Sequence, residues 1–478
     1  MRKTYKKTLP EAIDFSVSDL NRESWPPFLS EGRFTLMEPR ENVMGTKPVF
    51  PLLMSMSIPP MISMLIQSMY NVVDSIFVAR ISEKALTAVS LAYPLQNLIL
   101  AVAVGYGVGI NACIAKSLGA RKQEETNRAA AHGILFTLLH SILFVLIGLF
   151  LTKPFLGFFT SDPETFSMGC SYTYIVVCLS FGSIFHIYIE KMFQATGNMI
   201  MPMILQAAGA LTNIILDPIM IFGLFGFPAM GVAGAAYATV CGQVAAAVIT
   251  AFGGVRRPPE FRKMKVYIKQ IYWLGYASIL QQAMYTVYIV ILNAILAGFS
   301  DSAVTVLGLY YKMQTFFFIP LMGLQTCIVP VLSFNYATKS YGRCRETMKD
   351  SYLFSCGFML IGGGCFVFFP VELLRIFSDS SEVIAIGKTA FPIIGSSFIP
   401  AVFSLMTPVF FQAIGNGRVS LFLSVMRQIF CLIPIFWALS LLGLQFTWFA
   451  FPISEVLVGV TGMGVYWRTI NGWKNSRK

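Results

Sequence analysis

The chain has 478 residues, of which 56% are hydrophobic and only 12% are charged, a composition too apolar for a soluble protein with a polar surface. The mean hydropathy of +0.68 predicts instead an integral membrane protein. The formal net charge of +12 could suggest nucleic-acid binding, but the basic residues alternate from loop to loop, which is the positive-inside pattern of membrane proteins. We therefore expect contact with a lipid bilayer and no nucleic-acid partner.

Residues 1–47 mix basic with acidic residues and hold no apolar core of the kind a signal peptide needs. We expect this segment to be a disordered cytoplasmic tail. Beyond it, apolar stretches of about 20 residues, enough to cross roughly 30 Å of hydrocarbon, recur to about Trp467. Twelve are found, near residues 49–78, 87–113, 129–151, 167–188, 199–222, 231–253, 271–298, 303–330, 351–371, 388–410, 419–441 and 449–467. The predicted fold class is an all-α integral membrane protein with twelve spans.

The first predicted span ends in the segment Tyr70-Asn-Val-Val-Asp74. Residues four apart lie on one face of a helix, so Tyr70 and Asp74 are expected to face the same way. Two interpretations of Asp74 stay open. It is either a carboxylate in interfacial water or a member of an ion site inside the protein.

The fifth predicted span places a carboxylate, Asp217, among residues suited to hydrocarbon. An Asp at mid-bilayer depth costs roughly 2.5 to 3.5 kcal/mol, so it usually faces a protein interior or a watery cavity. Asn213 shares its helical face, and Pro218 predicts an irregularity in the helix. With the N-terminus inside, Asp74, Asp217 and Thr239 of the sixth span all fall in the outer half of the membrane. If the two carboxylates share a chamber, it would hold a proton or a sodium ion.

The basic residues of the loops gather on one side of the membrane, and both termini are therefore predicted to be cytoplasmic. The side rich in basic residues holds Arg121, Lys122, Arg128, Lys191, Arg256, Arg257, Arg262, Lys263, Lys265, Lys339, Arg343, Arg345, Lys349, Arg418, Arg468 and Lys474. The opposite side holds chiefly Arg80, Lys84, Lys153, Arg375 and Lys388.

The second half of the chain carries a different set of ionisable residues within its predicted spans. Lys312 lies in span eight, Arg427 in span eleven and Glu455 in span twelve. Either these residues compensate one another's charge inside the protein, which avoids an unpaired buried ion, or they contact the substrate.

An offset of about 218 residues aligns the chain with itself at several separate places. The segment Phe193-Gln-Ala-Thr-Gly-Asn198 recurs as Phe411-Gln-Ala-Ile-Gly-Asn416. Each repeat holds six spans, an even number, so both halves enter the membrane in the same orientation and a solute path is expected between them. We expect an N-lobe over residues 48–254, a basic cytoplasmic linker over 255–270, a C-lobe over 271–467 and a cytoplasmic tail over 468–478.

The acidic residues do not follow the repeat, because the offset places Asp74 opposite Leu292 and Asp217 opposite Ile435. The chain also shows no nucleophile–base pair, no metal-ligand spacing and no Walker sequence. We therefore predict that it is not an enzyme, that it uses no cofactor, and that ATP is not its direct fuel.

Several segments resemble the multidrug and toxic compound extrusion (MATE) family, within the wider group of multidrug, oligosaccharidyl-lipid and polysaccharide exporters. They look most like its bacterial branch related to DNA-damage-inducible proteins and staphylococcal drug exporters. The segments are Met44-Gly-Thr-Lys-Pro48, Tyr70-Asn-Val-Val-Asp74-Ser-Ile-Phe77, Asn213-Ile-Ile-Leu-Asp217-Pro218, Gly234-Ala-Ala-Tyr-Ala-Thr239 and Phe334-Asn-Tyr-Ala337.

The resemblance implies two six-helix lobes forming a V in the bacterial cytoplasmic membrane, and efflux of organic cations driven by inward protons or sodium. In similar members a cluster in the N-lobe binds the coupling cation. Carried over residue by residue, this cluster would comprise Tyr70, Asp74, Asn213, Asp217 and Thr239. Sodium, where it is the coupling ion, would be held transiently by Asp74, Asn213 and Asp217.

The leading hypothesis is a secondary active antiporter that exports amphipathic, cationic drugs and works as a monomer. A first rival in the same superfamily is a flippase for a lipid-linked saccharide, which would need a strongly cationic cavity for pyrophosphate. A more distant rival is a channel or receptor scaffold without coupling.

Overall fold

The computed structural model describes residues 43–160, 162–251, 264–378 and 380–475, and the regular elements among them are all helices. Most of the predicted N-terminal tail, most of the predicted linker and the last three residues lie outside the described residues. The end of the predicted tail forms a short helix, α2 (Val43–Thr46), in which Met44 is fully buried.

The N-terminal half of the structure forms one helical lobe, called the N-lobe below. Its helices are α3 (Val49–Ala79), α4 (Glu83–Gly119), α5 (Gln123–Phe159), α6 (Pro163–Cys178), α7 (Phe181–Ala195), α8 (Ile200–Phe222), the one-turn η2 (Leu224–Gly226) and α9 (Val232–Ala251).

The C-terminal half forms the second lobe, the C-lobe. Its helices are α10 (Met264–Ala297), α11 (Asp301–Ala337), α12 (Tyr341–Phe368), α13 (Pro370–Arg375), α14 (Ser381–Gly395), α15 (Phe398–Ala413), α16 (Gly417–Val425), the π-helical segment η4 (Met426–Leu432), α17 (Ile433–Ser440), α18 (Leu444–Thr447) and α19 (Ala450–Asn475).

The predicted spans are found at their expected places, with longer helices and two breaks. Among the described residues, nine helices are long and apolar enough to cross a membrane, and two bent pairs, α6 with α7 and α14 with α15, each make one further broken span. The shorter apolar helix Val232–Val248, in α9, takes the place of span six. The all-α multi-span fold is thereby confirmed, whereas spans four and ten, expected as single helices, bend by 42° and 52°.

The internal repeat appears in the backbone as well as in the sequence. Ser82 caps α4 by accepting the amide of Ala85, and Ser300 caps α11 by accepting the amide of Ala303. The recurring six-residue segment forms the same turn twice, with Gly197 at φ +89° and Gly415 at φ +87°. Only glycine adopts such angles readily, which explains why this segment is so similar in the two halves.

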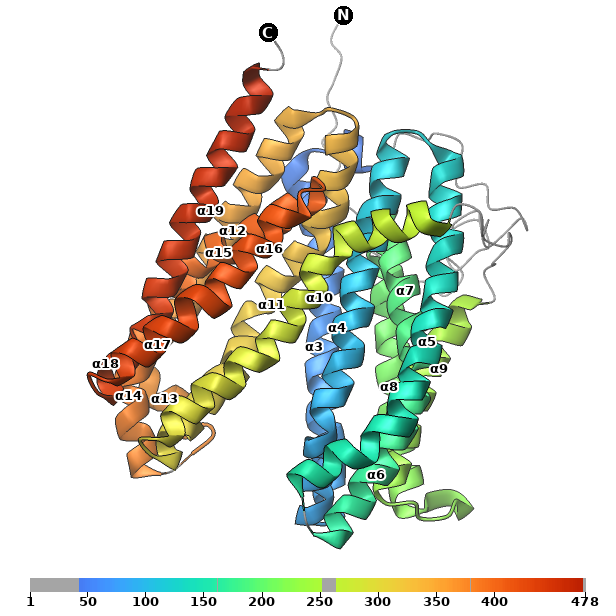
Figure 1. Ribbon diagram of the computed structural model, residues 1–478, viewed down its shortest axis with the longest axis vertical. Helices are drawn as coiled ribbons and strands as arrows, with labels where there is room; N and C mark the ends of the chain where they lie inside the picture. The colour runs from blue at the N-terminus through green and yellow to red at the C-terminus, as the bar shows by residue number, and fades with distance from the viewer. Residues whose placement is uncertain (1–42, 161, 252–263, 379, 476–478) are drawn as a thin grey trace, which may run out of the picture.

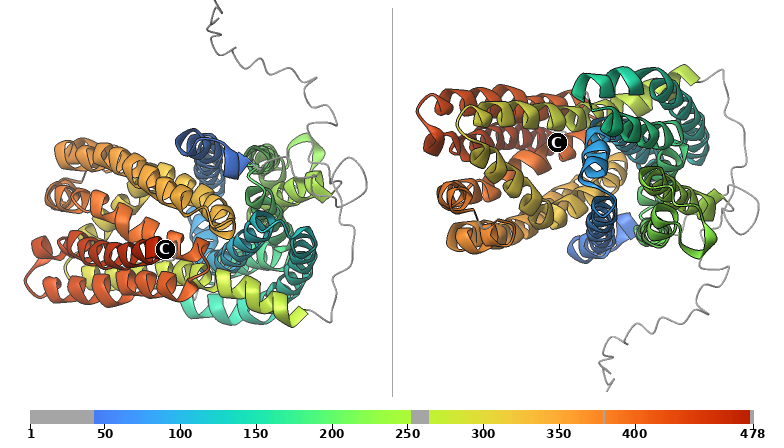
Figure 2. Two further views of the ribbon diagram at one scale, coloured as in Figure 1. Left: turned by 90° about the horizontal axis from the view of Figure 1, so that it is seen from above. Right: turned by 90° about the horizontal axis from the view of Figure 1, so that it is seen from below.

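The two lobes stand side by side and diverge away from the end that carries α2 and the C-terminal end of α19 (Figures 1 and 2). Near that end, α10 of the C-lobe packs along α4 of the N-lobe, and α11 packs along α3. Glycines permit this approach: a Cβ atom on Gly105 would lie 2.6 Å from the backbone nitrogen of Ile279. Such small-residue contacts between membrane helices replace the hydrophobic driving force that water would supply. The predicted V shape is therefore present.

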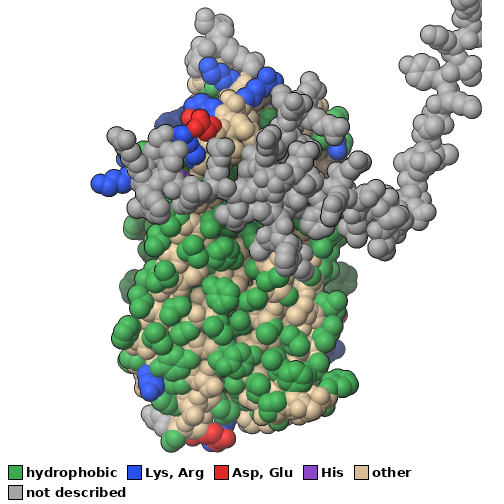
Figure 3. Space-filling model, turned by 90° about the vertical axis from the view of Figure 1, so that its right-hand side faces the viewer, with side chains coloured by type: hydrophobic (Ala, Val, Ile, Leu, Met, Phe, Trp, Pro, Cys, Tyr) green, Lys and Arg blue, Asp and Glu red, His purple; other side chains and the backbone are tan. Residues whose placement is uncertain are grey.

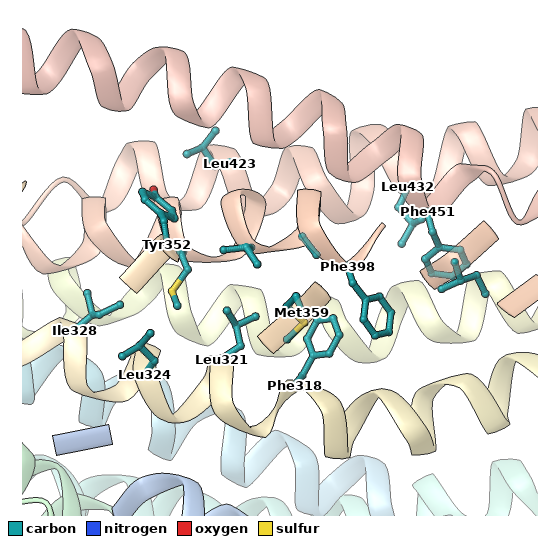
Figure 4. Close-up of a cluster of buried hydrophobic side chains, with 14 of the residues drawn as sticks. Phe318, Leu321, Leu324, Ile328, Tyr352, Met359, Phe398, Leu423, Leu432 and Phe451 are labelled. Atoms are coloured by element: carbon teal, nitrogen blue, oxygen red, sulfur yellow. The ribbon is translucent and has the colours of Figure 1, made fainter. Parts of the chain in front are cut away.

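The surface and the interior of the lobes are both apolar. On the face shown in Figure 3, hydrophobic side chains cover most of the body and charged side chains lie towards its ends, as expected of a protein surrounded by lipid. Inside the C-lobe, Phe318, Met359 and Phe398 belong to a large buried cluster that joins α11, α12 and α15 (Figure 4). Because lipid is as apolar as these side chains, close packing rather than exclusion from water holds the cluster together.

Candidate functional site

Helix α8 carries the candidate ion ligands Asn213 and Asp217 one turn apart, and both side chains are buried. Pro218 lies inside α8 and does not break it, so the predicted irregularity is not seen as an interruption of the helix. The neighbouring helix α9 approaches α8 closely at a pair of glycines. A Cβ atom on Gly242 would lie 2.6 Å from the carbonyl oxygen of Gly209, so only a residue without a side chain fits there.

The close approach of α9 brings Thr239 to the two α8 residues. The Asn213 amide donates to Asp217 Oδ1 over 3.3 Å and to Thr239 Oγ1 over 3.4 Å. The Thr239 hydroxyl donates in turn to the carbonyl of Ala235 over 3.0 Å. The hydroxyl oxygen of Thr239 is thus presented to the site as an acceptor.

Helix α3 supplies Asp74 and Tyr70 to the same place. The carboxyl groups of Asp74 and Asp217 lie within hydrogen-bonding distance of each other. The Tyr70 hydroxyl lies close enough to interact electrostatically with both carboxyl groups. Two carboxylates in contact inside a protein cannot both stay ionised without a proton or a cation between them. The five predicted residues therefore converge, and their role in coupling stays a prediction.

Three buried oxygens of this cluster have no hydrogen-bond partner in the described part of the chain: Asp74 Oδ1, Asn213 Oδ1 and Asp217 Oδ2. Unpaired buried acceptors are costly, and each needs a proton, a cation or a water molecule to satisfy it. An all-oxygen set with two carboxylates suits a proton or a hard cation such as sodium. The burial of Asp74 Oδ1 argues against the alternative of a fully hydrated interfacial carboxylate.

The site opens onto a cavity of about 950 Å³ between the lobes. Asp74, Tyr70, Asn213 and Thr239 line this cavity, whereas Asp217 lies behind them. The C-lobe contributes mainly amide and apolar side chains to the wall, among them Gln281, Gln325 and Met322. A solute in the cavity therefore lies next to the carboxylate site, and what binds at one place changes the charge felt at the other.

Sequence reasoning missed several polar residues of the cavity. Tyr172 of α6 accepts a hydrogen bond from Gln96 over 3.1 Å and lies near Asp74 and Tyr70. Glu190 and Lys191 of α7 also line the cavity. Lys191 was predicted in a cytoplasmic loop, which was wrong because α7 continues to Ala195 and buries it. The apolar run ends at Ile189, directly before these two charged residues, so no sequence signal separated them from a loop.

Of the three ionisable residues predicted in the C-lobe, Lys312, Arg427 and Glu455, only two lie together. Arg427 Nη2 lies 2.6 Å and its Nε 2.9 Å from Glu455 Oε1, and the Ser404 hydroxyl donates to Glu455 Oε2. Neither residue of the pair lines the cavity, which favours charge compensation over substrate contact. Lys312 was expected to be buried beside them, but it is exposed and makes no ion pair within the described ranges. The side chain of Lys312 projects outward from α11, and sequence periodicity in an apolar helix could not show that.

Two helical lobes that cross a membrane around a shared cavity define a membrane transporter. The model of the MatE family matches residues 59–219 and again 277–437, and the chain therefore belongs to the MatE (MATE) family of transporters, which are not enzymes. The two matches are separated by the same offset as the internal repeat, so each half of the chain is one copy of the family unit.

Relatives and solved structures agree with this assignment. The multidrug export protein MepA of Staphylococcus saprophyticus is 22% identical over 427 residues, covering 87% of this chain and 93% of that protein. MepA of Staphylococcus aureus is 22% identical with the same coverage. A crystal structure of MATE in complex with MaL6 superposes with a TM-score of 0.84 at 22% identity over 91% of this chain and 99% of that one.

A further solved structure, the outward-facing conformation of a multidrug resistance MATE family transporter, has a TM-score of 0.82 at 23% identity, covering 91% of this chain and 99% of that one. A MOP superfamily transporter from Pyrococcus furiosus has a TM-score of 0.83 at 23% identity, also over 91% and 99% of the two chains. At this identity the structural matches establish the fold. They leave the substrate and the coupling ion to be argued from the site.

Proposed function

We propose that this transporter is a secondary active exporter of amphipathic, cationic compounds, driven by the inward movement of protons or sodium ions. The observation that carries the proposal is the contact between Asp74, at the wall of the inter-lobe cavity, and Asp217, which is buried behind it. The staphylococcal relatives are named multidrug export proteins, which supports an exporter of drugs.

The mechanism follows from charge balance at the carboxylate pair. With a proton or sodium ion bound, the pair is neutralised and Asp74 can lie against Asp217 inside the N-lobe. When the ion leaves, the two negative charges repel each other, and a positively charged solute in the cavity becomes the more favourable partner. Ion and substrate therefore compete for one region. Exchange results if each occupant favours a different access state of the lobes.

We further propose that both termini are cytoplasmic and that the chain works as a monomer in the bacterial cytoplasmic membrane. The number of spans is even, and α2 and the C-terminal end of α19 lie at the same end of the molecule (Figure 1). With those ends inside, the lobes diverge towards the outside, and the cavity with its carboxylates is reached from there. A reporter domain fused after Lys478 that becomes active only outside the cell would contradict this orientation.

The deciding experiment measures ethidium transport in proteoliposomes with pH and sodium gradients imposed separately. We expect ethidium to move against its own gradient when either the proton gradient or the sodium gradient is directed inward. The gradient that drives this movement identifies the coupling ion. Asp301→Asn is the matched control, because this carboxylate is exposed at the start of α11. Transport that ignores both gradients would refute coupled export.

The lipid-linked saccharide flippase fits the cavity less well. Lys191 is the single Lys or Arg among the described lining residues, and its ammonium is paired with Glu190. A pyrophosphate group would need several unpaired cations. A counterflow assay distinguishes an uncoupled channel from a carrier. A carrier exchanges labelled for unlabelled ethidium across a membrane without a net gradient, whereas a channel does not accumulate the label.

A further inference from the structure

Helix α7 presents a second group of ionisable side chains to the cavity, apart from the Asp74–Asp217 site. Lys191 Nζ lies 3.0 Å from Glu190 Oε1 and donates to Gln194 Oε1 over 3.0 Å. The Gln194 amide donates to Glu190 Oε1 over 2.7 Å. The Lys191 and Glu190 side chains are 10% and 21% exposed, so the pair is partly desolvated and still reachable from the cavity.

This α7 ion pair is well separated from the carboxylate pair. One turn before Glu190, the side chain of His186 contacts Gln206 Oε1 of α8 over 3.2 Å. Gln206 precedes Asp217 by 11 residues on the same helix, which is roughly 16 Å along the axis. A solute the size of a drug can therefore touch both places, but a single ion cannot.

The scaffold itself does not require the ion pair. The repeat offset places Pro408 and Val409 of α15 opposite Glu190 and Lys191, although Gln194 has its counterpart in Gln412. The equivalent helix of the C-lobe thus forms the same turn and fills the same place with apolar residues. Placing two charges in a low-dielectric wall costs desolvation energy. The Glu190–Lys191 pair lines the cavity, whereas the Arg427–Glu455 pair of the C-lobe does not, and this position indicates a role in binding.

Building on the proposed export function, we propose that Glu190 and Lys191 form a substrate-selectivity site that favours amphipathic zwitterions, compounds with a cationic group and a carboxylate. On binding, the cationic group of the substrate would replace the Lys191 ammonium as the partner of Glu190. The carboxylate of the substrate would then pair with that Lys191 ammonium. All four charges then stay paired. A simple monocation that binds at Glu190 leaves the Lys191 ammonium without a carboxylate and close to a like charge, so the wild-type pair disfavours it at this place in the cavity.

The test compares rhodamine B, a zwitterion near neutral pH, with its ethyl ester, a cation of nearly the same shape. Binding of each dye to the full chain in lipid nanodiscs is followed by fluorescence polarisation. The measured quantity is the Kd of the ester divided by the Kd of rhodamine B. We expect this ratio to fall about tenfold in Lys191→Gln and to rise about tenfold in Glu190→Gln, since each change removes one charge-assisted contact.

Two further variants keep the test decisive. The double variant Glu190→Gln/Lys191→Gln leaves no unpaired charge, so it should fold even where a single variant does not, and it should lose the preference for rhodamine B. Lys84→Gln removes an exposed ion pair with Glu164 away from the cavity and should leave the ratio unchanged. A ratio that stays at the wild-type value in all the α7 variants overturns the proposal, because a purely structural pair affects both dyes alike.

Failure here is distinguishable from failure of the exporter function. If coupled ethidium transport is found and the dye ratio does not respond to the α7 variants, the selectivity site is wrong and the exporter stands. If the ratio shifts as expected but no gradient drives ethidium, the binding site stands and coupled export is wrong.

Discussion

Each lobe has polar residues on the same two helices of the repeat, but their charges differ. Among the residues that the structure describes, the N-lobe has carboxylates without a cationic partner, and the C-lobe has a closed ion pair. In the N-lobe, α8 and α9 carry Asp217 and Thr239. In the C-lobe, the repeat counterparts of these helices, α16 to α17 and α19, carry Arg427 and Glu455. The repeat offset places Arg427 opposite Gly209, eight residues before Asp217, and Glu455 opposite Tyr237, two residues before Thr239, so the C-lobe pair does not occupy the positions that bear the N-lobe site.

The difference between these clusters supports the proposal that the N-lobe exchanges ions. Glu455 has a guanidinium and a hydroxyl as permanent partners, so its charge is satisfied without any mobile ion. The N-lobe carboxylates have no cationic side chain in contact, and two of their oxygens are buried without a partner within the described ranges. A closed ion pair supports a fold, whereas an unsatisfied carboxylate pair must acquire its counter-ion from solution.

The largest effect is expected from Asp217→Asn. The amide keeps the shape and the contact with Asn213 but removes the charge that is proposed to hold the coupling ion, so gradient-driven ethidium efflux should fall below detection. Folding should be unaffected, since an amide is cheaper to bury than a carboxylate. Proteoliposome transport, normalised to folded protein, measures the loss. Efflux still driven by the ion gradient in this variant would remove Asp217 from the coupling site.

The C-lobe pair should show the reverse pattern, a stability defect without a coupling defect. Glu455→Gln leaves Arg427 charged and unpaired, which should destabilise the protein by about 3 kcal/mol. The double variant Arg427→Met/Glu455→Gln removes both charges and should regain most of the lost stability. Thermal unfolding in detergent reports the stability of each variant. If the double variant is folded but cannot couple transport to the gradient, the pair has a functional role and the comparison fails.

Thr239→Val should have an intermediate effect. Valine keeps the shape of the side chain and deletes one oxygen acceptor, while Asp74, Asn213 and Asp217 remain. We expect the gradient needed for half-maximal efflux to rise about threefold to tenfold, in line with the loss of one hydrogen-bonding or ligand contact of about 1 kcal/mol. The maximal rate should stay the same. Thr305→Val, at an exposed position of α11, is the matched control.

Much of the fold follows from hydropathy and from the repeat. The twelve apolar stretches all correspond to observed helical segments, because each has to satisfy its backbone within the bilayer. The breaks after Cys178 and Gly395 were not predicted, since neither is marked by a change in hydropathy. The ends of α7 and α10 were also placed differently, because these helices continue past the hydrocarbon-like residues.

The site was predictable where its residues share a helix and unpredictable where they do not. Asn213 and Asp217 stand four apart, so their common face can be read from the sequence. Tyr172 comes from α6, and no spacing links it to Asp74 of α3. Glu190 could not be predicted as a cavity residue for a similar reason. It lies at the end of a predicted span, and its position beside the cavity depends on how far α7 extends. Only the packing of separate helices reveals such neighbours.

The smallest effect is expected from Lys312→Met, which completes the comparison of the lobes. Lys312 was grouped with Arg427 and Glu455 because all three are ionisable residues in apolar spans, but it is exposed and does not line the cavity. Removing its charge should leave both the unfolding temperature and ethidium efflux within error of the wild type. A clear loss of transport in this variant would show that a C-lobe cation acts on the substrate, and the assignment of ion exchange to the N-lobe alone would then fail.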